Sequence, residues 1–272
     1  MPELPEVESI ARRLRPQLLG KTILDAHLRW SRTLAIPSPR TFKELIRGQE
    51  IKDVTRRAKY FILRLSDFSL LIHLRMSGDL LIKESTIKPE KHDRLILNLQ
   101  SVPLAESSLH NLVFNDTRKF GRVWLTTKPE EVLGRLGPEP LSRGFTPQWL
   151  HTALHSKHRQ LKPLLLDQTF LAGLGNIYTD ESLHRAKLHP LAASNSVTAK
   201  QAEALHEAVR SVLKEGIRRN GASFDWVYRG GEYHFQVYDR TGKPCPVCGT
   251  PIERIVVGQR STHFCPQCQT LS

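Results

Sequence analysis

The first 18 residues carry apolar side chains at the spacing of one helical face. These side chains are Leu4, Val7, Ile10, Ala11, Leu14 and Leu18. Arg12, Arg13 and Arg15 fall off the apolar stripe. Pro5 suits the first turn of a helix, where its missing N–H has no partner to lose. The pattern predicts an amphipathic helix that begins almost at residue 5.

From about residue 22 to residue 125 the pattern changes to short apolar runs. The runs are Thr22–Leu28, Glu50–Thr55, Tyr60–Leu65, Leu70–Leu74, Asp79–Ile82, Arg94–Leu99, Leu112–Asn115 and Arg122–Leu125. Turn formers such as Ser66-Asp67 and Ser77-Gly78 separate them. Many short strands at this spacing are typical of a β-sandwich or barrel. With the preceding helix they predict a first domain over residues 1–134.

After residue 134 the spacing of apolar residues becomes helical. The predicted helices are Thr146–His155, Gln160–Leu166, Asn176–Arg185 and Thr198–Arg219. Thr198 and Gln201 have the spacing of a capping box at the start of the last helix. Gly173 and Gly175 precede the third helix and could bring backbone N–H groups to a phosphate, although such pairs more often mark a plain tight turn. We expect a helical domain over residues 135–222.

All four cysteines lie in the last 28 residues. Cys245 and Cys248 form one Cys-x-x-Cys pair, and Cys265 and Cys268 form a second after sixteen intervening residues. This is the spacing of a four-cysteine zinc site. Two disulfides are the alternative, which a reducing cytosol disfavours. Because four thiolates leave no position for water, we expect one structural Zn²⁺ that holds a β-hairpin, in a third segment of residues 223–272 that begins with a polar loop.

The chain is strongly basic, with 40 Lys and Arg against 27 Asp and Glu and a formal net charge of +13. This excess favours nucleic acid as a partner, because Lys and Arg that neutralise phosphates release counterions. A ribosome-associated protein, or one that simply has a high isoelectric point, is the alternative. No apolar run approaches the roughly 20 residues of a membrane span, and the acidic N-terminus is unlike a signal peptide. We expect a cytoplasmic monomer.

Seven motifs occur in order over nearly the whole chain. They are Pro2-Glu-Leu-Pro-Glu-Val-Glu8, Arg57-Ala-Lys-Tyr60, His73-Leu-x-Met-Ser-Gly78, Lys91-His-Asp93, Asp116-x-Arg-x-Phe-Gly121, Gly173-x-Gly-Asn-Ile-Tyr178 and the cysteine hairpin. Together they resemble bacterial formamidopyrimidine-DNA glycosylase. The resemblance implies an α+β fold with an N-terminal helix and β-sandwich, a helix-two-turns-helix domain and a C-terminal zinc-finger β-hairpin. It also implies a bifunctional base-excision repair enzyme acting on double-stranded DNA with oxidised bases, in the bacterial cytoplasm at the nucleoid.

Pro2 is the candidate nucleophile. If Met1 is removed, Pro2 becomes a terminal secondary amine, and an α-amino group with a pKa near 7.7 to 8.0 is roughly a tenth neutral at pH 7. Attack on the sugar C1′ would expel the damaged base and leave an iminium that permits strand cleavage by elimination. From the residues alone, Pro2 would instead shape the entry to a helix whose dipole Glu3, Glu6 and Glu8 complement. The resemblance favours the catalytic interpretation.

The resemblance assigns further catalytic roles by position. Glu3 matches the general acid that assists sugar ring opening and base loss, and Glu6 lies close to it. Lys59 matches the lysine that contacts phosphate beside the nucleophile and donates a proton in β-elimination. Arg260, between the two cysteine pairs, matches the arginine assigned proton donation in δ-elimination.

The resemblance also implies DNA contacts. Met76, Arg118 and Phe120 would fill the gap left by the extruded nucleotide, with the guanidinium bonded to the orphaned base, which for a lesion of guanine is cytosine. His92, Lys157 and Asn176 match residues that hold phosphates. Without the resemblance, Met76 and Phe120 would be taken as core residues, and the lone histidine and lysine as surface residues.

Two departures and two alternatives bear on the substrate. The segment Gly221–Gln236 is shorter than the family's usual loop over an extruded 8-oxoguanine, and Asp239 replaces a usual glycine. Because the shorter loop would cap the extruded base less well, we expect 8-oxoguanine to be removed less well than formamidopyrimidines or more oxidised lesions. An endonuclease VIII-like enzyme for oxidised pyrimidines is one alternative. Its relatives usually have glycine at the position of Leu4, so the resemblance favours the branch of the family that acts on purine lesions. A noncatalytic binder of damaged DNA would be expected to lose Pro2, Glu3 or Lys59, and all three are present.

Overall fold

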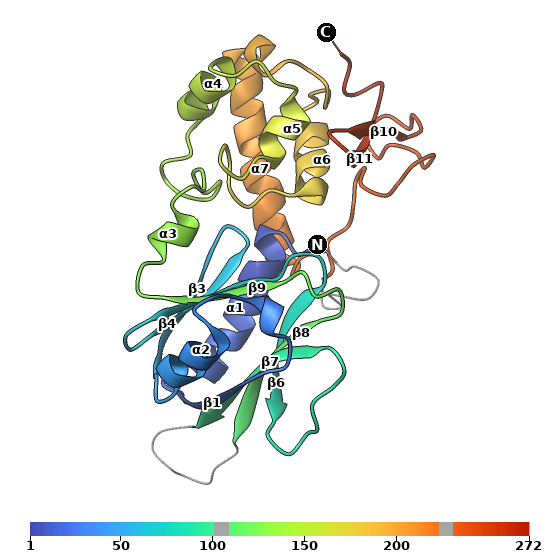
Figure 1. Ribbon diagram of the computed structural model, residues 1–272. Helices are drawn as coiled ribbons and strands as arrows, with labels where there is room; N and C mark the ends of the chain where they lie inside the picture. Colours follow the sequence, from blue (N-terminus) through green and yellow to red (C-terminus); the bar gives the residue numbers. More distant parts are fainter. Residues whose placement is uncertain (101–108, 223–230, 272) are drawn as a thin grey trace. The chain divides into compact units, whose positions relative to one another are not determined.

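The computed structural model describes residues 1–100, 109–222 and 231–271 (Figure 1). These residues divide into two compact units, of which the first contains residues 1–134 and residue 231, and the second residues 135–222 and 232–271. Each unit has its own secondary structure. Within the described ranges, no helix combines the length and the apolar character needed to cross a bilayer.

The first unit is a β-sandwich with one long helix, α1 (Leu4–Leu18). One sheet has the order β1 (Thr22–Leu28), β7 (Asp93–Gln100), β8 (His110–Asp116) and β6 (Gly78–Glu84). The other has the order β2 (Leu34–Ile36), β9 (Arg122–Thr126), β5 (Ser69–His73), β4 (Tyr60–Leu65) and β3 (Ile51–Arg57). All neighbouring strands are antiparallel except β2 and β9.

The core of this unit lies between the two sheets and the apolar stripe of α1. It joins Val7, Ile10 and Leu14 of the helix to buried side chains of both sheets, such as Leu97 and Phe61. Period-two burial along strands such as β4 is what a half-buried sheet face requires. The predicted helix and sandwich are therefore confirmed, and the predicted strands agree with the observed ones to within two residues.

Residues 29–49 contain elements that the sequence pattern did not reveal. They hold a 3₁₀ turn (Ser31–Thr33), β2 and the helix α2 (Pro39–Ile46). Ser38 caps α2, since its Oγ accepts a hydrogen bond from the Thr41 N–H at 3.3 Å. The helix buries only Phe42 and Ile46, one pair at i and i+4, so its apolar period is too short to recognise. A further short helix, α3 (Glu130–Leu133), buries no residue.

The second unit contains four helices and a hairpin. The helices are α4 (Pro147–His155), α5 (Leu161–Leu166), α6 (Asn176–Arg185) and α7 (Ala199–Arg218), with a 3₁₀ turn at Ser194–Ser196. The strands β10 (Glu253–Val257) and β11 (Arg260–Phe264) pair in antiparallel fashion. Thr198 and Gln201 form the predicted capping box, in which Gln201 Oε1 accepts from the Thr198 N–H at 2.9 Å. The predicted helices and hairpin are confirmed.

Helix α6 is buried although much of its sequence is polar, because its polar side chains bind other segments of the second unit. Asp180 Oδ2 accepts a hydrogen bond from the His263 N–H of β11 at 2.9 Å. Lys162 of α5 lies 2.6 Å from Asp180 and donates to the Ser261 carbonyl at 2.7 Å. Both ionic side chains are completely buried. A polar cluster therefore fixes the hairpin strand to two helices.

Glu181, the next residue of α6, binds the chain that leads into the hairpin. Its carboxylate accepts hydrogen bonds from the N–H groups of Gln236, Val237 and Tyr238 at 2.9 to 3.1 Å. The Tyr233 hydroxyl lies 3.3 Å from the same carboxylate. Burial raises the pKa of Glu181, and these hydrogen bonds oppose that shift because they stabilise the charged form. The segment after residue 231 is thus held to α6 before the cysteines begin.

Candidate functional site

The start of α1 brings three of the predicted site residues together. Pro2 is buried, Glu3 is 2% exposed and Glu6 is completely buried. Glu3 is the N-cap residue of α1, and Glu6 Oε2 accepts a hydrogen bond from the Glu3 N–H at 2.7 Å. The two glutamates form a capping box, which fixes the entry of the chain into the helix. Pro2, directly before the cap, is therefore attached to a rigid element.

The electrostatic environment of the chain terminus favours a neutral amine. Burial lowers the pKa of the Met1 amino group, and the charges of Lys59 and Arg118 lower it further. Glu3 and Glu6 act in the opposite direction. The Pro2 nitrogen is in a peptide bond with Met1, and removal of Met1 would make it a secondary amine one residue from this position. Burial and the two cations act in the same direction on any amine here.

Lys59 lies in a two-residue turn between β3 and β4. Arg57 and Tyr60 are paired across this turn, and Ala58 between them has a left-handed φ of 52°. A hairpin turn of this length favours positive φ values because they match the twist of the strands. Lys59 is 5% exposed. The turn thus holds a lysine in a mostly buried position whose charge acts on the chain terminus.

His73, at the end of β5, is a neighbour of this site that the sequence analysis did not single out. Its Nδ1 accepts a hydrogen bond from the Arg75 N–H at 3.0 Å, and its ring meets that of Tyr60 edge-on at 4.7 Å. Burial lowers the pKa of His73 to about 3, with smaller contributions from Arg75 and Lys59. His73 is therefore neutral at neutral pH, with its proton on Nε2. Its only signal in the sequence was its place at the head of a motif.

The three predicted gap-filling residues lie in two turns of the first unit. Met76, half-buried, is in the turn between β5 and β6. Arg118 and Phe120 are in the turn between β8 and β9, where the Arg118 guanidinium carbon is 5.4 Å from the Phe120 ring centre. Phe120 is 53% exposed, so it is not the core residue that its type alone suggested. An exposed apolar side chain next to an exposed cation is suited to contact with nucleic acid.

His92 precedes β7 and is half-buried. Its Nδ1 lies 3.1 Å from an Nη of Arg94. Arg94 in turn donates through Nε to the Asp116 carbonyl at 2.7 Å. The His92 ring is therefore held at Nδ1 by Arg94, which is itself hydrogen-bonded to β8.

Apart from the four cysteines, the second unit holds three predicted site residues. Lys157 is exposed just after α4. Asn176 opens α6, and its Nδ2 donates to the Ser261 carbonyl at 3.0 Å, directly beside Arg260, which is exposed at the start of β11. The Asn176 Oδ1 is buried and accepts no hydrogen bond from the described residues. The structure thus brings Asn176 to the strand that carries Arg260, whereas Lys157 belongs to a different part of the unit.

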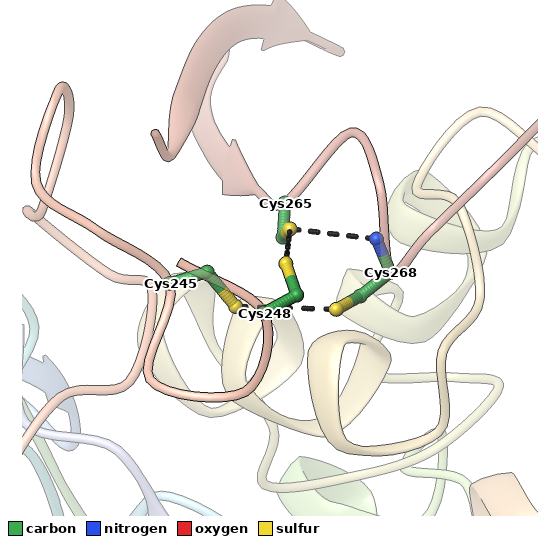
Figure 2. A group of neighbouring side chains, drawn as sticks. All are labelled: Cys245, Cys248, Cys265 and Cys268. Carbon is green, nitrogen blue, oxygen red and sulfur yellow. Dashed lines mark hydrogen bonds between the residues drawn. The ribbon is translucent and has the colours of Figure 1, made fainter. Parts of the chain in front are cut away.

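The four cysteine sulfurs form a compact group (Figure 2). All four Sγ atoms lie within 4.8 Å of one another, and no disulfide joins them. Tetrahedral zinc with Zn–S bonds of about 2.3 Å places its sulfurs about 3.8 Å apart, so the group fits one such ion. Cys245 and Cys265 are buried, Cys268 is half-buried and Cys248 is exposed. The predicted zinc site is confirmed as a set of four soft ligands.

Hydrogen bonds to sulfur support the cysteine group. The N–H groups of Val247 and Cys268 point at the sulfurs of Cys245 and Cys265, at 3.5 and 3.4 Å. His184 of α6 is 5% exposed, and its Nε2 lies 3.4 Å from the Cys245 sulfur. Donors of this kind orient a thiolate ligand and stabilise its charge. His184 was not predicted, since it stands some sixty residues before the cysteine that it contacts.

Asp239 stands where the backbone is left-handed, with φ of 56°. This region favours glycine, and among other residues aspartate and asparagine enter it most readily. The replacement of a usual glycine by Asp239 is therefore compatible with the same backbone. Half of the segment Gly221–Gln236, residues 223–230, lies outside the described residues, so the expected effect of its length stays a prediction.

Three family models match the chain in succession. The formamidopyrimidine-DNA glycosylase N-terminal domain matches residues 1–123, the formamidopyrimidine-DNA glycosylase H2TH domain matches residues 136–226, and the zinc finger found in FPG and IleRS matches residues 242–271. The order of the three matches follows the order of the sandwich, the helices and the cysteine hairpin.

Individual relatives match over the full length. A formamidopyrimidine-DNA glycosylase of Chloroflexus aggregans is 47% identical, covering 100% of this chain and 99% of the relative. That of Chloroflexus aurantiacus is 46% identical, covering 99% and 98%. Among solved structures, MutM in complex with DNA containing carbocyclic 8-oxo-G is 35% identical with a TM-score of 0.91. Lactococcus lactis Fpg with DNA containing an abasic site is 34% identical, also at 0.91. Both comparisons cover 99% of this chain and 100% of the other.

Proposed function

The chain belongs to the formamidopyrimidine-DNA glycosylase family, and from this we propose that it excises oxidised purines from DNA and then cleaves the strand at the abasic site. The observation that carries the proposal is the start of α1. Pro2 lies there against a capping box of two buried glutamates, and the charge of Lys59 acts on the chain terminus.

We propose that the Pro2 amine, freed by loss of Met1, is the nucleophile. Its lone pair attacks C1′, the glycosidic bond breaks, and the bonding electrons leave with the base, which takes up the proton that the Pro2 nitrogen loses. Glu3 supplies the proton that O4′ takes up as the C1′–O4′ bond breaks, which opens the sugar ring, assists base loss and leaves Pro2 as an iminium, and Glu6 fixes Glu3 through its backbone N–H. Burial and the cations support this role, because a lower amine pKa leaves more of the amine neutral.

Strand cleavage follows from the iminium that joins Pro2 to C1′. This cation acidifies C2′, so loss of a C2′ proton expels the 3′ phosphate in β-elimination, and a second elimination expels the 5′ phosphate. We assign Lys59 to phosphate contact and proton donation in the first step, and Arg260 to proton donation in the second. Lys59 is suited to its role because the turn between β3 and β4 fixes it where its charge acts on the terminus.

We propose that Met76, Arg118 and Phe120 fill the gap left by the extruded nucleotide, and that His92, Lys157 and Asn176 hold phosphates. The exposure of Phe120 and its contact with Arg118 support the first assignment. The bond from Asn176 to Ser261 supports a shared phosphate site with Arg260. Contacts to phosphate give no sequence preference, which suits an enzyme that must search any DNA.

We propose that the three segments 1–134, 135–222 and 223–272 act as a catalytic sandwich, a DNA-binding helical domain and a loop with a zinc hairpin. Cys245, Cys248, Cys265 and Cys268 would hold the ion, which supplies stability to a hairpin with little core of its own. We also place the enzyme in the bacterial cytoplasm at the nucleoid. Its action on DNA and the organisms of its relatives support this location.

Excision assays on matched duplexes test this function. The substrates carry formamidopyrimidine, 8-oxoguanine or thymine glycol opposite the normal partner base. Thymine glycol is included because a solved Lactococcus lactis relative holds DNA with an oxidised pyrimidine. We expect formamidopyrimidine to be removed fastest, with 8-oxoguanine slower because of the short segment 221–236. Equal high efficiency on both purines would overturn the effect of the segment, and preference for thymine glycol would favour the endonuclease VIII-like alternative.

A further inference from the structure

Two turns of the first unit are packed against one phenylalanine. Phe114 of β8 is 1% exposed. A Cβ placed on Gly78 would lie 2.8 Å from its ring, and a Cβ placed on Gly121 would lie 2.3 Å from it. Both distances are too short for any side chain, so each turn needs glycine where it meets the ring. Gly78 ends the turn of Met76, and Gly121 ends the turn of Arg118 and Phe120.

A single buried carboxylate joins the same two turns by hydrogen bonds. Asp116 is completely buried. Its Oδ1 accepts from the Ser77 hydroxyl, and its Oδ2 accepts from the Gly121 N–H at 2.8 Å. The Arg118 N–H donates to Ser77 Oγ at 3.0 Å and to Asp116 Oδ1 at 3.2 Å. Ser77 follows Met76 directly, so these bonds connect the backbone of one turn to that of the other.

Both turns contain a non-glycine residue in the left-handed region. Arg75 has φ of 55° and Lys119 has φ of 62°. Such residues are strained and persist where surrounding contacts determine the conformation. The Lys119 ammonium lies 4.1 Å from the ring centre of Trp30, which holds the second turn from another side. The conformation of the two turns is therefore imposed by these contacts.

We propose that Asp116 and Ser77 are positioning residues that lock the Met76 turn and the Arg118–Phe120 turn into one rigid wedge. This inference rests on the proposed function of Met76, Arg118 and Phe120, which is to fill the gap left by the extruded nucleotide. A rigid wedge enters the base stack as a unit, so the ordering of three side chains and two turns costs little when DNA binds. Without the hydrogen bonds of Asp116 and Ser77, each turn would have to become ordered when DNA binds.

The locked arrangement also determines which orphaned base is accepted. The Arg118 guanidinium only donates hydrogen bonds. The pairing edge of cytosine offers two acceptors, O2 and N3, whereas that of adenine offers one acceptor beside a donor amino group. The hydrogen bonds of the Arg118 N–H fix the backbone of this residue, so that its guanidinium is placed to donate to both acceptors of cytosine. A mobile guanidinium would adapt to either base. The bonds from Arg118 to Ser77 and Asp116 therefore set the preference for the opposite base.

The test compares the variants Ser77→Ala and Asp116→Asn with the wild-type chain. Ser85→Ala is the matched control, since Ser85 is an exposed serine of the same unit, outside the wedge. Single-turnover excision of formamidopyrimidine is measured opposite cytosine and opposite adenine, and elimination is measured at an abasic site in single-stranded DNA. Thermal unfolding of each variant shows whether it is folded.

We expect Ser77→Ala to lower the cytosine-to-adenine ratio of excision rates by about tenfold, the effect of one lost buried hydrogen bond. Asp116→Asn should lower the ratio at least as much. Excision opposite cytosine should fall more than elimination in the single strand, where there is no orphaned base. A purely structural role would lower the unfolding temperature and leave the ratio unchanged.

Two results separate the failure of this inference from failure of the proposed function. If the wild-type chain excises the lesion with a preference for cytosine, but both folded variants keep the wild-type ratio, the positioning role is wrong and the function stands. If the wild-type chain excises no lesion in either duplex, the proposed function itself fails. Ser77→Ala keeps the test valid if Asp116→Asn does not fold, because it removes only a hydroxyl.

Discussion

The ammonium group of Lys162 lies 2.6 Å from the carboxylate of Asp180, and both side chains are completely buried. Removal of one partner of such a pair leaves an uncompensated charge, which costs about 3 to 5 kcal/mol. We expect Lys162→Met to lower the free energy of unfolding of the second unit by about the same amount. Urea unfolding measures this change. The control is Arg159→Gln, which breaks the exposed pair of Arg159 and Asp167 at 2.7 Å and should cost less than about 1 kcal/mol. Equal effects of both variants would show that the pair of Lys162 and Asp180 is not buried in solution.

His184 should slow the loss of zinc from the cysteine group. Its Nε2 lies 3.4 Å from the Cys245 sulfur, and a donor there stabilises a thiolate ligand. We expect His184→Leu to release zinc about tenfold faster to a coloured chelator, the lower end of the effect of such support. His184→Gln can place an amide N–H near the position of Nε2 and should recover much of the loss. His158→Leu, at an exposed histidine of the same unit, is the control. Zinc release that is equally fast in the Leu and Gln variants would show that the hydrogen bond has no role.

His73 predicts a specific pH dependence of stability. Burial lowers the pKa of His73 to about 3 in the folded chain, against 6.5 for an unperturbed histidine. Between these values the unfolded chain binds more protons, so stability rises with pH up to about 6.5 and is lost as pH falls toward 3. The slope from this residue is at most about 1.4 kcal/mol per pH unit.

The variant His73→Asn isolates this contribution. Its Oδ1 can accept the hydrogen bond from Arg75 in place of Nδ1, and it does not titrate. We expect the free energies of unfolding of His73→Asn and the wild type, measured from pH 4 to 8, to converge or cross as pH falls below about 6. A difference between the two that is the same at every pH would show that His73 is not buried as a neutral ring.

The left-handed backbone of Asp239 should make two substitutions at this position differ in their effect on stability. Because its φ is 56°, Asp239→Gly removes the strain of a left-handed side chain and should change stability by less than about 1 kcal/mol. Asp239→Val places a β-branched residue in the same region and should destabilise the chain by more than about 1 kcal/mol. Thermal unfolding measures both. A valine variant as stable as the glycine variant would mean that the left-handed conformation is absent in solution.

Local patterns in the sequence were sufficient to predict most of the elements. The apolar period of α1, the capping box at Thr198 and the cysteine spacing each depend on residues that are close in the sequence. Helix α2 was missed because two buried side chains do not make a period. The predicted sandwich followed from short runs divided by turns, but its strand orders depend on pairings between distant residues that no local pattern contains.

The candidate site, like the fold, has features that local sequence patterns predict and features that depend on residues distant in the sequence. The motifs contain Pro2, Lys59 and Arg118, but nothing in their spacing predicts the hydrogen bonds that join distant motifs. Asp116 lies 39 positions from Ser77, and His184 lies 61 positions from Cys245. Lys162 and Glu181 were missed because charged residues on predicted helices are normally exposed. Their burial depends on partners that only the structure identifies, namely Asp180 for Lys162 and three backbone N–H groups for Glu181.

The proposed role of Pro2 requires that its amine form the covalent bond to the sugar. Mass analysis of the adduct trapped with borohydride on DNA that contains an oxidised purine identifies the residue that forms this bond. If Pro2 is the nucleophile, the peptide carrying the reduced sugar begins at Pro2, without Met1, and the adduct forms at the same position in Lys59→Ala. An adduct located at Lys59 or at any other lysine, or no adduct from protein that has lost Met1, would contradict this role.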